Sequence, residues 1–340
     1  MNPFNPQFYT PFAASTYSYG RAALALAQLT VLLFTPEWAL TVPVGDTGHT
    51  TCAGLENLSA YCVGGGDTSF WVGRAISVVV LLSVICGWRP RWTSVPHAWV
   101  TVSFLHAISL PDGGEAVLAT MTILLIPLCL ADSRRWAWPA ASPDDDVRTW
   151  GRRDGIAAAV QWALRAQVAG IYFHSALAKL AVPDWVNGSA MYYVTREHFF
   201  GATGFVGDIM RAITDTAFGT ATLTWGTVLV ESLIAVCILG TVRLRRVAVI
   251  LAVALHVGII IVLGLWSFGI VMCGAVFVAA SLPSSALRLP PRRSRPQAAS
   301  APASSLDLEF LNSARVPEYT ASPATSAPTT ASRTEAPGIL

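Results

Sequence analysis

One lysine stands out among the residues that could do chemistry. The chain has 22 Lys and Arg residues, and Lys179 is the one lysine among them. It lies near the end of an apolar stretch that begins at Tyr172. Arginine stays protonated in proteins, whereas a lysine amine that is removed from water can lose its proton near neutral pH. This usage indicates a lysine whose proton must be removable, as in a general base. The alternative is an interfacial lysine that extends toward water.

Several polar groups accompany this lysine in apolar segments. Ser175 is four residues before Lys179, so a helix places both on one face. His174 lies about 140° around the same helix from Lys179, where both could border one cavity. Because a lone intramembrane histidine is usually a packing residue, four of them on three segments favour a polar site. No His-x-x-x-His spacing accompanies them, so a metal site is not expected. The four are His97, His106, His174 and His256.

Two opposite charges also fall in the middle of apolar segments. Arg165 precedes Lys179 on the same segment, and Glu231 lies on the next long one. An ionisable group inside a bilayer is costly, so each needs a partner. We therefore predict an Arg165–Glu231 ion pair. A catalytic or proton-relaying Glu231 is the alternative.

The elements that must hold these groups are apolar helices. Hydrophobic residues make up 53% of the 340-residue chain and charged residues 12%, and the mean hydropathy is +0.52. A soluble domain carries about twice that charged share, so a water-soluble globular protein is excluded. The net charge of +2 is too small for a nucleic-acid-binding surface. We expect an integral membrane protein with the lipid bilayer as its surroundings and no nucleic-acid partner.

Eight segments approach the roughly 20 mostly apolar residues that a membrane crossing needs. They predict an all-α, polytopic membrane helix bundle over residues 19–282. The third and fourth segments are short, so a shallow hairpin is an alternative to two thin spans. Residues 1–18 form an N-terminal segment, and the Ala-, Ser-, Thr- and Pro-rich residues 283–340 are expected to be a disordered tail. The spans are Tyr19–Leu40, Phe70–Trp88, Pro96–Leu110, Glu115–Ala131, Gly155–Ala181, Phe218–Gly240, Arg246–Leu263 and Trp266–Leu282.

The basic residues predict the orientation of these spans. Arginines gather after the second, fourth, sixth and eighth spans, whereas the opposite loops hold only Arg196 and Arg211. Because basic loops stay in the cytoplasm, we expect both chain termini there. The first outer loop holds Cys52 and Cys62, and the outer side is oxidising. We therefore predict a disulfide between these two cysteines.

The stretch Tyr172–Leu180, followed by Asp184-Trp185-Val186-Asn187-Gly188, resembles a known motif. It is similar to the centre of the vitamin K-dependent gamma-carboxylase-like membrane domain, also called the HTTM domain. There an aromatic-rich helix ends in Lys-Leu and is followed by Asp-Trp-x-x-Gly. Within this family the chain most resembles the sporulation-delaying protein B group of bacterial membrane proteins. The two-cysteine loop, Val100–His106 and Asp112-Gly113-Gly114 carry that closer likeness.

The resemblance implies an enzyme. In the carboxylases a lysine base matches Lys179 and an active-site histidine matches His97. Their reaction uses a reduced quinone, which makes a quinone the candidate cofactor here. Tyr172, Trp185 and His256 are the candidates to bind it. The carboxylases have a large lumenal substrate-binding portion that the tail of this chain does not match, so gamma-carboxylation of glutamate is not expected.

The closer likeness implies a role in making a peptide toxin. The sporulation-delaying protein B group is linked to an exported antimicrobial peptide, or bacteriocin, and acts with a small companion protein on a secreted precursor. This implies a maturation factor in the bacterial plasma membrane, with Lys179, His174 and His106 in an outward-facing cavity. The alternative is a non-catalytic scaffold, or an export or immunity partner for the peptide.

Overall fold

The computed structural model describes residues 12–41, 52, 54–64, 69–109, 111–132, 134–138 and 152–281. These residues form helices joined by turns, and no strand occurs among them apart from an isolated bridge between Trp88 and Trp136. The predicted tail, 283–340, lies outside the described residues, as does 1–11 of the predicted N-terminal segment.

Each predicted span overlaps one long helix, which confirms the all-α membrane bundle, although the first span, Tyr19–Leu40, ends in the separate short helix α2. α5, α10 and α11 are long and apolar enough to cross a membrane, and α3 and α12 are shorter apolar helices. The number of crossings and their orientation stay predictions. The long helices are α1 (Phe12–Phe34), α3 (Ser69–Ile85), α4 (Pro90–Ala107), α5 (Gly113–Ala131), α6 (Arg152–Leu180), α10 (Ala217–Leu239), α11 (Val242–Leu263) and α12 (Trp266–Ala280).

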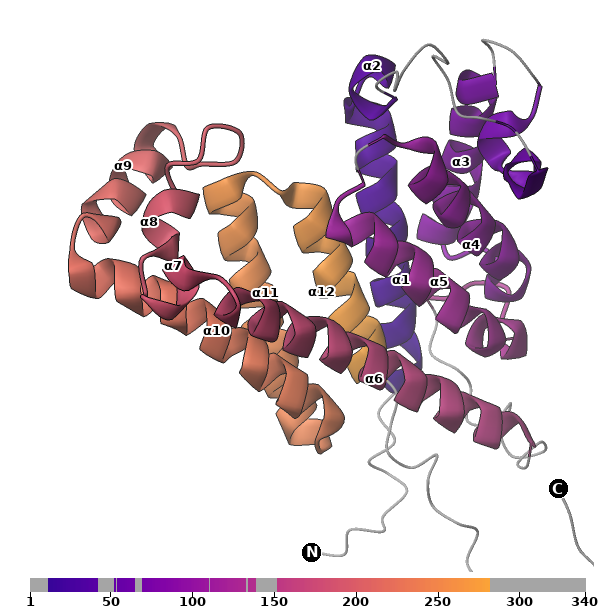
Figure 1. Ribbon diagram of the computed structural model, residues 1–340. Helices are drawn as coiled ribbons and strands as arrows, with labels where there is room; N and C mark the ends of the chain where they lie inside the picture. Colours follow the sequence, from indigo (N-terminus) through magenta and orange to yellow (C-terminus); the bar gives the residue numbers. More distant parts are fainter. Residues whose placement is uncertain are drawn as a thin grey trace, which may run out of the picture. The chain divides into compact units, whose positions relative to one another are not determined.

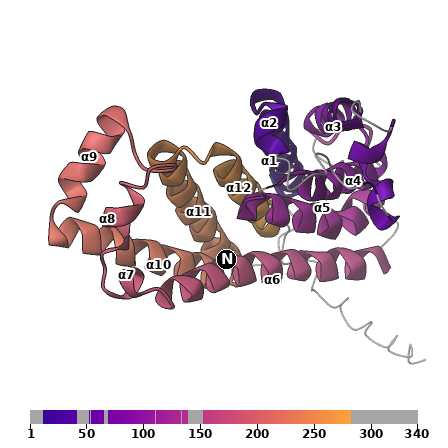
Figure 2. The same cartoon turned by 45° about the horizontal axis from the view of Figure 1, so that its top comes forward.

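The helices pack around two apolar clusters. One lies between α1, α5, α6, α10, α11 and α12, and the other lies between α1, α3 and α4. α12 packs on both α1 and α11, and α6 runs beside α10 and also contacts α5 and α12 (Figure 1, Figure 2). Small helical segments follow α1 and α6 at the ends of these long helices. They are α2 (Glu37–Leu40), α7 (Pro183–Val186), α8 (Ala190–Val194) and α9 (Gly204–Thr214).

Two glycines bring α1 and α12 into backbone contact. A Cβ atom added to Gly20 would lie 2.8 Å from the carbonyl oxygen of Gly274 and 2.9 Å from the backbone nitrogen of Val278. A Cβ atom on Gly274 would lie 3.0 Å from the carbonyl oxygen of Gly20. Small residues at a crossing allow such close packing, which drives helix association inside a membrane. The α1–α12 crossing therefore depends on glycine on both helices.

The loop between α2 and α3 is tied down in two ways. Cys52 and Cys62 form the predicted disulfide, with an S–S distance of 2.06 Å. Next to it, Tyr61 of the short helix η3 (Ala60–Cys62) is buried against Phe70 and Phe104. Burial raises the pKa of Tyr61 to about 12. The loop is thus anchored by the buried aromatic ring of Tyr61 as well as by the disulfide.

The fourth helix begins earlier than the sequence predicts. The span was expected from Pro96, but α4 starts at Pro90, which occupies the first turn. Proline is favoured there because its fixed φ suits a helix and the first turn needs no N–H. Pro96 then lies inside the helix. His97 is consequently an interior residue of α4 rather than its first.

The start of α5 follows directly from its sequence. The Asp112 side chain accepts hydrogen bonds from the backbone N–H groups of Gly114 and Glu115. The Glu115 carboxylate in turn accepts from the backbone N–H of Asp112 at 2.8 Å. This reciprocal capping box satisfies N–H groups that the helix itself leaves free. At the other end, Asp132 pairs with Arg134 and accepts from Tyr17 of α1.

The glycine crossing makes a prediction about stability. Gly20→Ala should lower the free energy of unfolding by about 1–3 kcal/mol, because its methyl group would meet the backbone of α12. Thermal unfolding of the detergent-purified protein measures this. Gly258→Ala on α11 is the matched control, because a Cβ atom there meets nothing within 4 Å. Equal melting temperatures for the two variants would contradict the role of the crossing.

The disulfide makes a prediction about topology. In Cys62→Ser, Cys52 becomes a free thiol, and a membrane-impermeant maleimide should label it in intact cells if this loop faces outward. The natural free thiol of Cys86 is the internal control, because it is exposed and is predicted on the cytoplasmic side. Labelling of the unmodified protein at Cys86 in intact cells would reverse the predicted orientation.

Candidate functional site

Lys179 lies in the last turn of α6, opposite Glu231 in the middle of α10. Its Nζ is 2.8 Å from each oxygen of the Glu231 carboxylate, and the two helices lie side by side in Figure 1 and Figure 2. Nζ also donates to Ser175 Oγ at 2.8 Å, which confirms that Ser175 and Lys179 share a helix face. Ser175 Oγ donates to Glu231 Oε1 at 3.2 Å. The three side chains form a closed hydrogen-bonded set.

This set is only partly shielded from its surroundings. The exposed fraction is 19% for the Lys179 side chain and 9% for Glu231. Ion pairs strengthen as the surroundings lose polarity, so this pair is stronger than one on a water-facing surface. The arrangement is therefore a strong ion pair that is not fully buried.

The turn after α6 brings an aromatic ring to the lysine. Trp185 of α7 has its ring centre 5.3 Å from Lys179 Nζ, a cation–π contact. The chain then turns through Gly188, whose φ of +79° favours glycine. At Gly188 the turn meets Ala221 of α10, and the Met191 N–H donates to Thr224 of α10 at 3.1 Å. The Asp-Trp-x-x-Gly motif thus closes one side of the Lys179–Glu231 pair.

A second polar pair joins α6 to α11, at a position nearer the start of α6 than Lys179. The Tyr172 hydroxyl is 2.8 Å from Nε2 of His256 on α11, and both residues are buried. The other ring nitrogen of His256, Nδ1, is buried without a hydrogen-bond partner among the described residues. Tyr172 lies two helical turns before Lys179, at about 10 Å along the axis. Of the three candidate cofactor residues, only Trp185 contacts Lys179 directly.

The predicted Arg165–Glu231 ion pair is wrong, because Glu231 pairs with Lys179 instead. Arg165 lies 14 residues before Lys179 on α6, which separates them by about 21 Å along the helix. Its Nε donates to the Ala279 carbonyl oxygen at 3.2 Å, and its guanidinium lies over the Trp162 ring. Glu231 meets the last turn of α6, so Arg165 is out of its reach.

The other predicted site residues are not brought to Lys179. His174 is exposed on α6 and lies around the helix from the lysine, as its spacing requires. His106 is exposed on α4 and bonds through Nδ1 to the Val102 carbonyl oxygen of its own helix. His97 is buried on α4, with Nε2 lacking a partner among the described residues. In both views α4 lies far from the end of α6 that carries α7 (Figure 1, Figure 2).

Sequence reasoning thus found Lys179, Ser175 and Glu231 but not their connection. It placed Trp185 and Tyr172 only through the family resemblance. Residue type alone does not separate Lys179 from Arg165 as the partner of Glu231, because both are basic residues on the preceding long segment. Arg165 carries the same positive charge but lies at a different position along the helix axis. The position of each residue along its helix axis decides which of them meets Glu231. The predicted span boundaries were too uncertain to give that position.

The chain matches known proteins over most of its length. Residues 121–281, which contain the whole Lys179 site, match the HTTM domain family. The protein YitO of Bacillus subtilis, described as uncharacterized, is 34% identical over 267 residues, or 78% of this chain and 84% of YitO. The sporulation-delaying protein SdpB of Bacillus subtilis is 28% identical over 271 residues, or 79% of this chain and 82% of SdpB. No solved structure matches the chain.

The region that matches the HTTM domain family includes Lys179, Glu231 and the Asp-Trp-x-x-Gly turn. The share of each relative that is covered leaves little outside the common region. The all-α bundle with apolar helices agrees with a membrane domain. The chain belongs to the HTTM-domain membrane proteins, in the group that contains YitO and SdpB of Bacillus subtilis.

Proposed function

We propose that this protein is a bacterial membrane maturation factor for an exported antimicrobial peptide, in which Lys179 acts as a general base. The observation that carries the proposal is the closed set of Lys179, Glu231 and Ser175, built around the only lysine of the chain. Similarity to SdpB supports the peptide-toxin pathway. The proposed partners are a secreted peptide precursor and a small companion protein.

The geometry explains how a paired lysine becomes a base. Lys179 Nζ lies 2.8 Å from both oxygens of Glu231 and 2.8 Å from Ser175 Oγ. A proton that moves from the amine to the carboxylate therefore has a direct path between atoms 2.8 Å apart. Transfer of a proton from the amine to Glu231 converts the charged pair into two neutral groups, and weakly polar surroundings lower the cost of that change relative to water. The neutral amine can then take a proton from a substrate.

Arginine could not replace lysine in this step. A guanidinium keeps its proton under any condition in which a protein is folded, whereas a lysine amine can release it. Ser175 holds the amine in place during the exchange, because its hydroxyl both accepts from Lys179 and donates to Glu231. Glu231 is therefore the proposed internal proton acceptor, and Ser175 is a positioning residue.

The family resemblance makes a reduced quinone the candidate cofactor. Trp185 presents a partly exposed flat ring 5.3 Å from Lys179 Nζ, which suits contact with another flat ring. Tyr172 and His256 are buried and bonded to each other, so neither is available for the same contact. Trp185 would hold the ring, and a bound quinol would supply electrons. The steps assigned above to Lys179, Glu231 and Ser175 involve only protons.

Replacement of the lysine tests the proposal. Lys179→Arg should accumulate in the membrane and abolish peptide maturation, because it keeps the charge but not the removable proton. The measurement is the mass of the secreted peptide from cells with and without the variant. Arg211→Lys at the exposed Arg211–Asp208 pair is the control and should leave the peptide unchanged. Normal peptide from Lys179→Arg would favour a non-catalytic scaffold or an export or immunity partner.

A double replacement separates stability from activity. Lys179→Met alone should lower the free energy of unfolding by about 3–5 kcal/mol, because Glu231 is left as an unpaired buried charge. Lys179→Met combined with Glu231→Met should recover most of that loss, since apolar residues of similar size replace the pair. Peptide maturation should still be absent in the double variant. Recovery of maturation together with stability would make the pair purely structural.

A further inference from the structure

The short helix α9 presents an apolar face that the described helices leave open. Phe205, Ile209 and Ile213 follow one another at intervals of four residues, so they lie within about 80° of one another around the helix. Phe205 is 79% exposed, and both isoleucines are exposed as well. A row of large exposed apolar side chains marks a surface that another molecule covers.

The charged side chains of α9 lie on a different side of the helix. Counted around the helix axis from Phe205, Asp208 and Arg211 lie at about 300° and 240°. Asp215, which caps the end of the helix, lies between them at about 280°. Arg211 pairs with Asp208 at 2.7 Å, and Arg196 pairs with Asp215 at 2.7 Å. The charges on this side therefore balance one another within the protein.

A third side of α9 rests on the protein. Gly207 and Thr214 are buried and lie at about 200° and 180° on the same scale. A Cβ atom on Gly207 would lie 2.5 Å from the carbonyl oxygen of Ala202. Thr220 of α10 donates a hydrogen bond to the Thr214 carbonyl oxygen at 2.6 Å. Because this contact lies between the apolar and the charged sides, one side of α9 can face lipid while the other faces water.

The neighbouring helix indicates that lipid covers the apolar face. α9 contacts α10, which is long and apolar enough to cross a membrane (Figure 1, Figure 2). Four exposed apolar residues of α10 lie within about 40° of one another around that helix. They are Phe218, Trp225, Leu229 and Val236. In a membrane-spanning helix such a row faces the bilayer. Since Phe218 is in the first turn of α10, lipid contact extends to within four residues of the end of α9.

The turn that leads into α9 is also suited to lipid. Phe199 and Phe200 are both exposed there. Their backbone N–H groups donate to the Glu197 carboxylate at 2.6 and 2.9 Å. The Gly201 N–H donates to the Glu197 carbonyl oxygen at 2.8 Å. Because these N–H groups are bonded within the turn, it can lie beside lipid without leaving them unsatisfied.

We propose that α9 is an interfacial anchor that lies along the membrane surface predicted to face outward. Phe205, Ile209 and Ile213 enter the phospholipid acyl chains, and Asp208 and Arg211 stay in water. An apolar side with a large aromatic residue opposite a charged side is typical of helices that bind at this interface. Because the charges are paired within the protein, the anchor needs no anionic lipid. The proposal uses no residue of the Lys179 set and is independent of the proposed function.

Nitroxide labels on the two sides of α9 test the proposal. The full-length protein carries Cys86→Ser, which removes an exposed free thiol, and is placed in phosphatidylcholine nanodiscs. A label is attached at Phe205→Cys or at Arg211→Cys, about 120° apart around the helix. Dissolved oxygen concentrates in lipid, whereas a nickel chelate stays in water. We expect oxygen to relax the Phe205→Cys label severalfold more than nickel does, and the reverse at Arg211→Cys.

Three results would overturn the proposal. A Phe205→Cys label that nickel relaxes as strongly as the Arg211→Cys label would place the apolar face in water. A Phe205→Cys label that neither reagent relaxes would place this face against protein, such as a second copy of the chain. Lipid exposure that appears only after phosphatidylglycerol is added would mean that charge, rather than the apolar face, holds the helix.

Removal of the apolar side chains gives an independent test. Phe205→Ser combined with Ile209→Ser should lower the ratio of oxygen to nickel relaxation severalfold for a label at Ile213→Cys. Neither replaced residue belongs to a buried apolar cluster, so the bundle should still fold. Leu55→Ser on the short helix η2 (Gly54–Leu58) is the matched control, because Leu55 is equally exposed but distant in sequence from α9. An unchanged ratio in the double variant, or an equal loss in the control, would contradict the anchor.

Discussion

The need to pair buried charge governs the arrangement of α6 and α10. Inside a membrane bundle an isolated ammonium or carboxylate is far more costly than in water. Lys179 and Glu231 meet this need together, with both carboxylate oxygens 2.8 Å from the amine. The pair holds the end of α6 against the middle of α10 and so sets the register of these helices. The Trp185 turn follows from that register, because the chain leaves α6 where the pair is formed.

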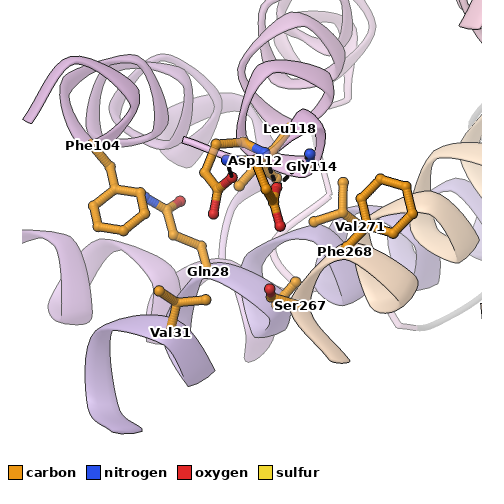
Figure 3. A pocket seen from close by; sticks show the side chains of 11 residues that line it. Gln28, Val31, Phe104, Asp112, Gly114, Leu118, Ser267, Phe268 and Val271 are labelled. Carbon is orange, nitrogen blue, oxygen red and sulfur yellow. Dashed lines mark hydrogen bonds between the residues drawn. The ribbon is translucent and has the colours of Figure 1, made fainter. Parts of the chain in front are cut away.

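Close packing of small residues serves the other part of the bundle. Gly20 and Gly274 let α1 and α12 approach to backbone contact, and α12 also packs on α11. Lipid tails are as apolar as the helix surfaces, so the hydrophobic effect does not drive the helices together inside the bilayer. Close van der Waals contacts of this kind provide much of the association instead. The same crossing brings the first turn of α12 toward Gln28 of α1. Gln28 and Ser267 of these two helices line a small cavity there (Figure 3).

Much of the architecture was predictable because it rests on local sequence. The eight apolar segments, the Asp112 capping box region and the shared face of Ser175 and Lys179 follow from residue type and helical periodicity. The Cys52–Cys62 disulfide was predicted from the compartment and composition of one loop. The start of α4 was missed because Pro96 resembles a helix start as much as Pro90 does. Residue type and periodicity predict whether a segment is a helix more reliably than they predict the residues at which the helix begins and ends.

The amino-acid sequence alone established a membrane bundle, marked Lys179 as the residue with unusual chemistry and identified Glu231 as a buried acid that needs a partner. Only the tertiary structure decided that these two meet, that Arg165 does not join them, and that His97 and His106 lie elsewhere. The reason is geometric. Periodicity gives the face and approximate depth of a side chain on its own helix, but the neighbour across the interface depends on how separate helices pack.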